Sequence, residues 1–342
     1  MHILSFETSC DDTSVALMKD GVLISMSTRT QLEHDVTGGV VPEVAARSHA
    51  NAIFPCIEDV LSEAQIDLQD IDYFACTEKP GLLPSLLTGL TVAKTLSLTL
   101  GKPLILVDHI ESHIFANLLE RDLAQIHFPT VVLTVSGGHT EIYHWKSLFE
   151  LDLLGQTRDD AAGECFDKVA KMMGLGFPGG AKIAKLASEY RIAHLSKLNP
   201  KSNLFPRVML EKDSLDFSFS GLKTAVKREI DKRIEGNEIL GEASITGNPL
   251  PIDDMREIAF ELESAIGEIL AMKLILAHKQ TGSKMMCLAG GVSANSHLKS
   301  ILSQYSTLHD VPFLAPVKNL YSMDNAAMVG IRAYYEIGSH SL

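Results

Sequence analysis

The sequence has few cysteines, no long hydrophobic run and no leader-like start. Its five cysteines (Cys10, Cys56, Cys76, Cys165 and Cys287) are scattered, odd in number and never in a CxxC pair. This pattern predicts reduced thiols and excludes a disulfide framework or a cysteine zinc knuckle. The chain opens on a strand-like Ile3–Phe6 rather than a basic and then apolar segment, and no apolar run approaches a membrane span. We expect a cytoplasmic protein without a membrane segment.

Basic residues are in the minority. Lys and Arg number 30 against 43 Asp and Glu, a formal net charge of −13, which argues against a general nucleic-acid coat because phosphate contacts require cations. A local basic patch is still compatible with this balance. The candidate is one expected helix, for which a solvated face is the alternative; its cations are Lys223, Lys227, Arg228, Lys232 and Arg233.

Several catalytic motifs are also absent. There is no Ser-His-Asp ordering and no P-loop, since Gly221–Thr224 lacks the upstream glycine of GxxxxGK[ST]. With no nucleophile indicated, we expect electrostatic activation of an already activated substrate rather than covalent catalysis.

Strand-like and helix-like segments alternate along the chain, which predicts an α/β protein with a largely parallel sheet. The order of strand, small polar turn and returning strand in residues 3–18 recurs in residues 130–145. This repeat predicts two related lobes.

A pair of histidines follows the apolar run 103–107. His109 and His113 are four residues apart at the start of an expected helix, so they share a face and can meet one ion. The alternative is a pair of surface or capping histidines. Asp324 is expected to cap a helix, but it would also supply a third ligand, and two His with one carboxylate suit Fe(II) or Zn(II). Glu111 lies two residues from each histidine and should point away.

Small residues follow three expected strands, at Thr8-Ser9, Ser136–Gly138 and Gly290-Gly291. Such turns expose backbone N–H groups and form anion nests, which favours a nucleotide or acyl phosphate between the lobes. Glu7 and Asp11 would position a metal or a ribose, or simply cap turns. Asp167, within an expected helix, would be solvated, paired or bound to ribose hydroxyls.

Taken together, these motifs resemble the tRNA adenosine threonylcarbamoyltransferases of the TsaD type, formerly described as O-sialoglycoprotein endopeptidases. The matching stretches lie in the family's order along nearly the whole chain: Phe6–Asp11, Gly38–Glu43, His109–His113, Val135–Thr140, Asp159–Lys168, Asp216–Thr224, Ala289–Asn295 and Asp324–Met328.

The resemblance implies the two-lobed fold of actin, hexokinase and Hsp70, with duplicated ribonuclease-H-like lobes and a ligand cleft between them. On that fold we expect an N-terminal lobe of residues 1–108, completed by 325–342. Residues 109–324 would form the second lobe, with a loop-rich insertion near 190–252.

The resemblance also implies a reaction and its residues. The threonylcarbamoyl group of threonylcarbamoyl-AMP would pass to N6 of adenosine 37, in tRNAs reading codons that begin with A, and AMP would leave. One iron or zinc ion would be held by His109, His113 and Asp324, with Glu7 and Asp11 near the phosphate and metal as catalytic residues. The adenylate would be lined by Thr134, Val135, Ser136, Gly137, Gly138, Asp167, Gly180 and Asn295.

Partners follow from the bacterial type of the family: tRNA, an inactive paralogue (TsaB type) and a small P-loop ATPase (TsaE type). The chain departs from the family at three positions. Lys79 stands where a glycine is usual, Asp12 where Glu is frequent, and Ser112 where Gly or Ala is usual. None removes a ligand, and Lys79 would add a phosphate or tRNA contact.

Three other functions compete with this one. A small-molecule kinase on the same fold would use the glycine turns but has no need of the histidine pair. A metalloprotease requires HExxH, and Glu111 is out of that register. A non-catalytic scaffold would be expected to lack the histidines.

Overall fold

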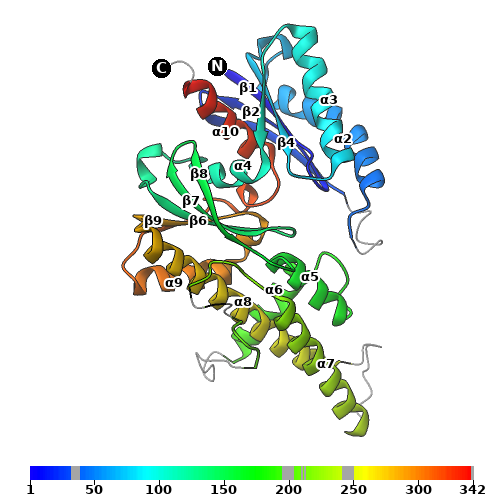
Figure 1. The fold of residues 1–342 in the computed structure, drawn as a ribbon. Helices are drawn as coiled ribbons and strands as arrows, with labels where there is room; N and C mark the ends of the chain where they lie inside the picture. Colours follow the sequence, from blue (N-terminus) through cyan, green and yellow to red (C-terminus); the bar gives the residue numbers. More distant parts are fainter. Residues whose placement is uncertain (32–38, 195–203, 209–210, 212, 241–249, 340–342) are drawn as a thin grey trace. The chain divides into compact units, whose positions relative to one another are not determined.

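The computed structural model contains two five-stranded sheets (Figure 1). It describes residues 1–31, 39–194, 204–208, 211, 213–240 and 250–339. Gly38 of the predicted 38–43 loop, parts of the predicted 190–252 insertion and the last three residues lie outside the described residues. The chain divides into two compact units, unit 1 (residues 1–125, 289–291 and 315–342) and unit 2 (residues 126–288 and 292–314).

The sheet of unit 1 has the strand order β3-β2-β1-β4-β5. β1 pairs antiparallel with β2 and parallel with β4, which pairs parallel with β5. β2 is buried along its whole length except its last residue, because helices cover both faces of the sheet. The strands are β1 (His2–Glu7), β2 (Asp12–Lys19), β3 (Val22–Thr30), β4 (Tyr73–Lys79) and β5 (Leu104–Asp108).

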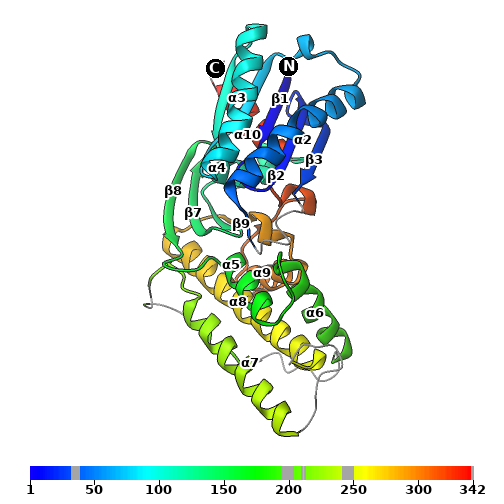
Figure 2. The ribbon, with the colours of Figure 1, turned by 90° about the vertical axis from the view of Figure 1, so that its right-hand side faces the viewer.

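Two helices, α2 and α3, lie side by side on one face of this sheet, and α10 lies on the other (Figures 1 and 2). α2 is continuous through Pro55, a residue type that usually kinks or breaks a helix. α3 begins at Leu83, just after the Pro80-Gly81 turn. The helices of unit 1 are α2 (Pro42–Ala64), α3 (Leu83–Leu100), α4 (His109–Phe115) and α10 (Ala326–Ser339), with short 3-10 turns at Leu68–Asp70, Ala116–Leu118, Leu123–Gln125 and Asn319–Tyr321.

Unit 2 repeats the strand order of unit 1, as β8-β7-β6-β9-β10. The duplicated plan predicted from the sequence is therefore confirmed. The edge strand β8 was not predicted. The elements are β6 (Thr130–Val135), β7 (Thr140–Ser147), β8 (Glu150–Gln156), α5 (Ala162–Met172), α6 (Gly180–Ala193), α7 (Ser220–Leu240), α8 (Ile252–Thr281), β9 (Met285–Ala289), a 3-10 turn (Gly291–Ala294), α9 (Ser296–Leu308) and β10 (Phe313–Leu314).

The unit boundaries differ from the predicted divisions at residues 108 and 324. Residues 109–125 and 315–324 belong to unit 1. The reason is local packing, because α4 lies against α10. Both histidines and Asp324 therefore lie in one compact unit.

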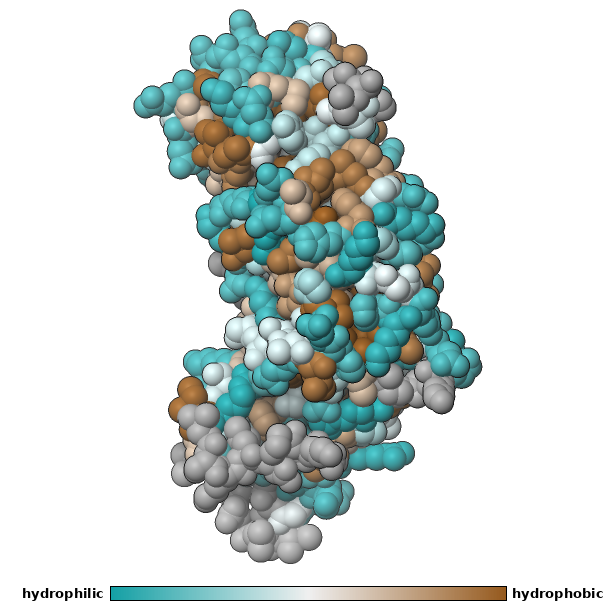
Figure 3. All heavy atoms as spheres, turned by 90° about the vertical axis from the view of Figure 1, so that its left-hand side faces the viewer, coloured by the Kyte–Doolittle hydropathy of each residue, from teal (hydrophilic) through white to brown (hydrophobic). Residues whose placement is uncertain are grey.

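α3 is long and apolar enough to cross a membrane by length and composition, with a mean hydropathy of 1.2 over 18 residues, of which 22% are buried. The expectation that no apolar run approaches such a span is thus wrong for this segment. Its inner face joins the core of unit 1 through Ala93, Leu90 and Leu96. A different face of the molecule, drawn in Figure 3, shows hydrophobic residues in separate patches among hydrophilic ones.

Two glycines of α10 provide a matched test of this packing. A Cβ on Gly330 would lie 2.5 Å from Met18 Cγ and 2.9 Å from Ser5 Oγ, whereas a Cβ on Gly338 meets nothing within 4 Å. We expect Gly330→Ala to lower the free energy of unfolding by about 1–3 kcal/mol through overpacking. Gly338→Ala should leave it unchanged or raise it by up to about 1 kcal/mol, because alanine favours helix. Denaturant unfolding of both variants measures the difference; equal effects would contradict the close packing of α10 on the sheet.

Candidate metal centre

The candidate metal centre lies at one edge of the first sheet. Because β1, β4 and β5 are parallel, their carboxyl ends meet at the same edge. Glu7 ends β1, Thr77 lies near the end of β4, and Asp108 ends β5 directly before α4. Strand ends that are far apart in sequence are thus brought together by the sheet.

Asp108 determines where α4 begins. Its Oδ1 accepts hydrogen bonds from the backbone N–H of Ile110 (2.9 Å) and Glu111 (3.2 Å), so it is the N-cap. The helix starts at His109, and His113 follows one turn later on the same face. The two imidazole centroids are 4.7 Å apart in an edge-to-face arrangement, and both rings are buried. The pairing predicted from the four-residue spacing is therefore present.

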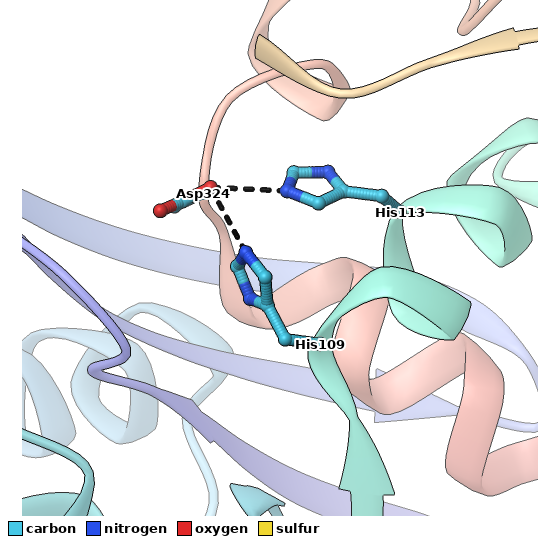
Figure 4. A group of neighbouring side chains, drawn as sticks. All are labelled: His109, His113 and Asp324. Carbon is cyan, nitrogen blue, oxygen red and sulfur yellow. Dashed lines mark hydrogen bonds and ion pairs between the residues drawn. The ribbon is translucent and has the colours of Figure 1, made fainter. Parts of the chain in front are cut away.

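The third member is Asp324, in the loop before α10. The expectation that Asp324 caps this helix is wrong: α10 begins at Ala326, and Asn325 Oδ1 accepts from Met328 N–H at 3.0 Å. Asp324 Oδ1 instead lies 3.1 Å from His113 Nε2 and 3.7 Å from His109 Nε2. Both imidazoles point toward it (Figure 4). One potential ligand atom from each residue lies within 4.8 Å of the other two.

Glu7 stands behind His109 and is fully buried. Its Oε2 lies 3.2 Å from His109 Nδ1 and accepts from Thr77 Oγ1 at 2.5 Å, while its Oε1 accepts from Ser9 N–H at 2.6 Å. A proton on Nδ1 directed at Glu7 leaves the lone pair of Nε2 facing Asp324, which is how carboxylates orient metal-binding imidazoles.

The electrostatics of the site favour a cation. Burial lowers the pKa of His109, but the carboxylates of Glu7 and Asp324 outweigh burial and raise the pKa to about 9. Burial raises the pKa of Glu7, yet His109 holds it below its usual value. Burial also keeps the pKa of His113 low, despite Asp324. Two carboxylates thus flank one imidazole, and one of them, Glu7, is fully buried.

These residues fit a divalent ion. Nε2 of both histidines and Oδ1 of Asp324 converge, and two imidazoles with one carboxylate suit Fe(II) or Zn(II). His113 Nδ1 is buried and has no hydrogen-bond partner within the described ranges, so only its Nε2 is engaged. The identity of the metal is not determined by this donor set.

Glu111 points away from the histidine pair, as the helical spacing predicts. Its Oε2 accepts from Arg332 Nε of α10 at 3.0 Å, and the Arg332 guanidinium lies over the Phe115 ring, 5.0 Å from its centroid. Glu111 therefore ties α4 to α10, which stabilises the helix that presents the histidines.

The second predicted catalytic residue, Asp11, is partly exposed at the turn before β2. The described hydrogen bonds connect the histidines to Glu7 and not to Asp11. The neighbouring Asp12 accepts from Thr30 Oγ1 at 2.5 Å, and its burial, together with Asp324 and Asp11, raises its pKa to about 7. Glu7 and Asp11 thus differ in burial: Glu7 is fully buried beside His109, whereas Asp11 is partly exposed.

The predicted adenylate residues lie in unit 2 and begin at the end of β6. Thr134 and Val135 end this strand, and Ser136 opens the turn, where its N–H donates to His139 O at 2.8 Å. Within the described residues Thr134 Oγ1 is buried without a hydrogen-bond partner. No atom lies within 4 Å of a Cβ built on Gly137 or Gly138, so the turn is open on that side.

Two further residues assigned to the adenylate, Asp167 and Gly180, lie near each other. Asp167 Oδ1 accepts from Gly179 N–H at 2.7 Å, directly before α6 starts at Gly180. A Cβ on Gly179 would lie 2.9 Å from Asp167 Cα, so this approach requires glycine. The remaining predicted residue, Asn295, caps α9 by accepting from the N–H groups of His297 (2.9 Å) and Leu298 (3.1 Å).

Sequence reasoning missed several supporting residues. Thr77 and Ser9, which hold Glu7, are ordinary small polar residues with no motif of their own. Glu263 of α8 is fully buried and accepts a hydrogen bond from Asn295. The only sign of this role in the sequence is a carboxylate among the apolar residues of a helix.

A substitution pair on α4 tests the metal centre. We expect the purified chain to bind one Zn²⁺ or Fe²⁺ per molecule, and His113→Gln to weaken that binding by at least about 100-fold because one of three ligands is lost. Glu111→Gln on the same helix should retain the ion, since Glu111 pairs with Arg332. Titration calorimetry and metal analysis after dialysis provide the measurement; metal retained by His113→Gln would refute the assignment.

Comparisons with known proteins identify the family of the chain. The model of the TsaD family, tRNA N6-adenosine threonylcarbamoyltransferase, matches residues 22–331. The tRNA N6-adenosine threonylcarbamoyltransferases of Staphylococcus aureus strains Newman and MRSA252 are each 40% identical over 335 residues, covering 97% of this chain and 91% of theirs.

Solved structures confirm the fold. Full-length HypF in its phosphate- and nucleotide-bound form has a TM-score of 0.58 at 13% identity, over 98% of this chain and 46% of HypF. Component A of the (R)-2-hydroxyglutaryl-CoA dehydratase of Acidaminococcus fermentans has a TM-score of 0.52 at 14% identity, over 99% of each chain. These likenesses show the actin- and hexokinase-like α/β fold. With the family model covering most of its length, the chain belongs to the tRNA N6-adenosine threonylcarbamoyltransferase family.

Proposed function

We propose that this chain transfers the threonylcarbamoyl group of threonylcarbamoyl-AMP to N6 of adenosine 37 in tRNAs that read codons beginning with A. The observation that carries the proposal is the convergence of His109, His113 and Asp324 in a chain of this family. A kinase on the same fold has no use for such a centre.

The reaction exchanges one bond at the carbamoyl carbon. The N6 amine forms a C–N bond and loses one proton, while the bond from that carbon to the phosphate oxygen breaks and AMP leaves with the electron pair. A bound Fe²⁺ or Zn²⁺ would supply Lewis-acid stabilisation of the charge that develops on the threonylcarbamoyl group.

The residues of the chain take separate roles in this proposal. Glu7 fixes the orientation of the His109 ring and does not touch substrate, because it is fully buried and its two oxygens are engaged by His109, Thr77 and Ser9. Asp11, which is partly exposed, is the residue we assign to the phosphate region and the reacting groups.

The adenylate is assigned to Thr134, Val135, Ser136, Gly137, Gly138, Asp167, Gly180 and Asn295. The open side of the Gly137-Gly138 turn allows backbone N–H groups to approach a phosphate. Asp167 Oδ1 accepts from Gly179 N–H directly before α6, and a carboxylate beside an open glycine turn is suited to accept from ribose hydroxyls.

The metalloprotease alternative is not supported. A general base beside a zinc ion must reach the bound water, and Glu111 is held by Arg332 on the far side of α4. Glu111, the carboxylate between the two histidines, is therefore not placed to act as the base of peptide hydrolysis.

Mass spectrometry of tRNA tests the proposed reaction. Purified chain, with its partners, threonine, bicarbonate and ATP, should yield threonylcarbamoylated adenosine in tRNA. His109→Ala should reduce the yield at least about 100-fold, because the ion can no longer be held, with an unchanged far-UV circular dichroism spectrum. Glu111→Gln serves as the matched control and should retain most of the activity. Phosphorylated product in place of modified tRNA would favour a kinase, and normal yield from His109→Ala would refute the role of the metal.

Partner proteins are the second part of the proposal. We assign tRNA, an inactive paralogue of the TsaB type and a P-loop ATPase of the TsaE type as partners, in the cytoplasm, where the free state of all five cysteines is expected.

The candidate basic helix α7 supports a role for partners in tRNA binding. Lys223 pairs with Asp160 at 2.5 Å, and Arg233 pairs with Glu229, Asp254 and Glu257, so much of its charge is already neutralised.

The outer face of α3 is the surface we assign to the paralogue. Leu83, Leu87 and Leu98 are 67%, 51% and 73% exposed, and Phe54 on the adjacent α2 is 55% exposed. Lys94 is the one charged residue in α3. Apolar helices packed side by side form a surface that a second pair of helices can cover.

A leucine pair tests this surface. We expect Leu98→Glu to weaken the complex with the paralogue at least about tenfold, because a charge would be buried at the contact. Leu308→Glu is the control, since Leu308 is equally exposed (77%) but lies at the end of α9 in unit 2. Light scattering after size exclusion and titration calorimetry measure the complex. If Leu308→Glu weakens the complex and Leu98→Glu does not, the outer face of α3 is not the interface.

A further inference from the structure

A buried carboxylate in unit 2 has no role in the reaction described so far. Glu263 lies on α8, the long central helix, and is fully buried. Its Oε1 accepts from Asn295 Nδ2 at 2.6 Å and its Oε2 accepts from Arg191 Nη1 of α6 at 2.5 Å. One side chain thus connects α6, α8 and the start of α9.

Stability alone is a weak reason for this arrangement. A buried ion pair loses hydration on both sides, and replacing it with apolar residues of similar volume is often neutral or stabilising. The neighbouring positions of α8, Leu262 and Ile266, are apolar core residues. A leucine at position 263 would extend the apolar core. The carboxylate is therefore better explained by the side chain to which it is hydrogen-bonded than by stability.

What Glu263 holds is the amide of Asn295. An asparagine amide has one oxygen and two N–H donors. Here the oxygen accepts from the N–H groups of His297 and Leu298, while Nδ2 donates one proton to Glu263. Both ends of the amide are therefore fixed, its flip is prevented, and one N–H donor remains for a ligand.

We infer that Glu263, itself held by Arg191, is a positioning residue for nucleotide binding: it fixes Asn295 so that the remaining Nδ2–H is presented to a hydrogen-bond acceptor of the adenylate. This inference rests on the proposed function, which assigns Asn295 to the adenylate site. Without Glu263 the cap of α9 would persist through the asparagine oxygen, but the donor would lose its fixed direction.

The test uses the full-length chain and AMP as the probe. Glu263→Gln places an amide between two donors, so one of its contacts becomes a repulsion. We expect the dissociation constant for AMP to rise about tenfold, the effect of losing one well-oriented hydrogen bond. In the transfer assay, KM for threonylcarbamoyl-AMP should rise similarly, with kcat at saturation within about twofold of the unmodified chain.

Glu261→Gln is the matched control. Glu261 is also a buried carboxylate on α8, 8% exposed, but two residues away it faces a different side of the helix. Glu261→Gln should change neither the dissociation constant for AMP nor KM for threonylcarbamoyl-AMP. An equal loss in both variants would mean that any disturbance of α8 weakens binding, and would overturn the inference.

A double-mutant cycle separates this inference from the proposed function. Asn295→Ala should weaken AMP binding, and in that background Glu263→Gln should have no further effect, because its action passes through Asn295. If Asn295→Ala binds AMP normally, the proposed adenylate site is wrong. If Asn295→Ala weakens binding while Glu263→Gln does not, only the positioning role fails.

Arg191→Gln is the second variant, in case Glu263→Gln does not fold, since Arg191 is partly exposed and on the surface side of the pair. It removes the partner of Glu263 and should raise KM in the same direction by a smaller factor. An unchanged KM in a folded Arg191→Gln would contradict the proposed chain of contacts.

Discussion

The metal centre depends on one buried contact, between Glu7 and His109. Both residues stand at carboxyl ends of parallel strands, so the pairing of β1 with β4 and of β4 with β5 places them together. The contact also sets the charge of the site. Nδ1 of His109 is directed at Glu7 and Nε2 faces Asp324, so a positive charge at this site, on the imidazole or on a bound ion, lies between two carboxylates. A divalent ion neutralises them, which is the physical reason that this arrangement is suited to a metal.

The same strand order gives unit 2 a different chemistry. After β1 the chain places Glu7 and Ser9, whereas after β6, the corresponding strand, it places Ser136 and two glycines. Carboxylates and histidines hold a cation, while an open glycine turn exposes N–H groups to an anion. One duplicated plan thus supplies the two kinds of group that an adenylate with a reactive acyl group requires, and the divergence lies in a few residues at the strand ends.

Local patterns predicted the parts of this fold that local interactions determine. The four-residue spacing of His109 and His113 was sufficient for the pairing on α4, and the alternation of strands and helices was sufficient for the α/β class. The predicted largely parallel sheet is wrong, because β1, β2 and β3 pair antiparallel, as do β6, β7 and β8. Tertiary packing decided the rest. Asp324 and Asn325 are both good helix caps, and only their surroundings select Asn325 for the cap and leave Asp324 for the histidines. Proline inside a helix favours a kink or a break, but α2 is continuous through Pro55 because its buried face is packed against the sheet.

α3 shows why composition and packing must be considered together. By length and hydropathy alone it could cross a membrane. However, Gly89 lies so close to β1 that a Cβ there would be 2.4 Å from Thr8 Oγ1, and Thr8 donates a hydrogen bond to Ser85 O. The helix is therefore fixed to the strand end next to Glu7, and removing it to a membrane would expose the core of unit 1. Its outward leucines are better explained as a protein contact, and any partner seated there would bind a helix that is itself anchored beside the metal centre.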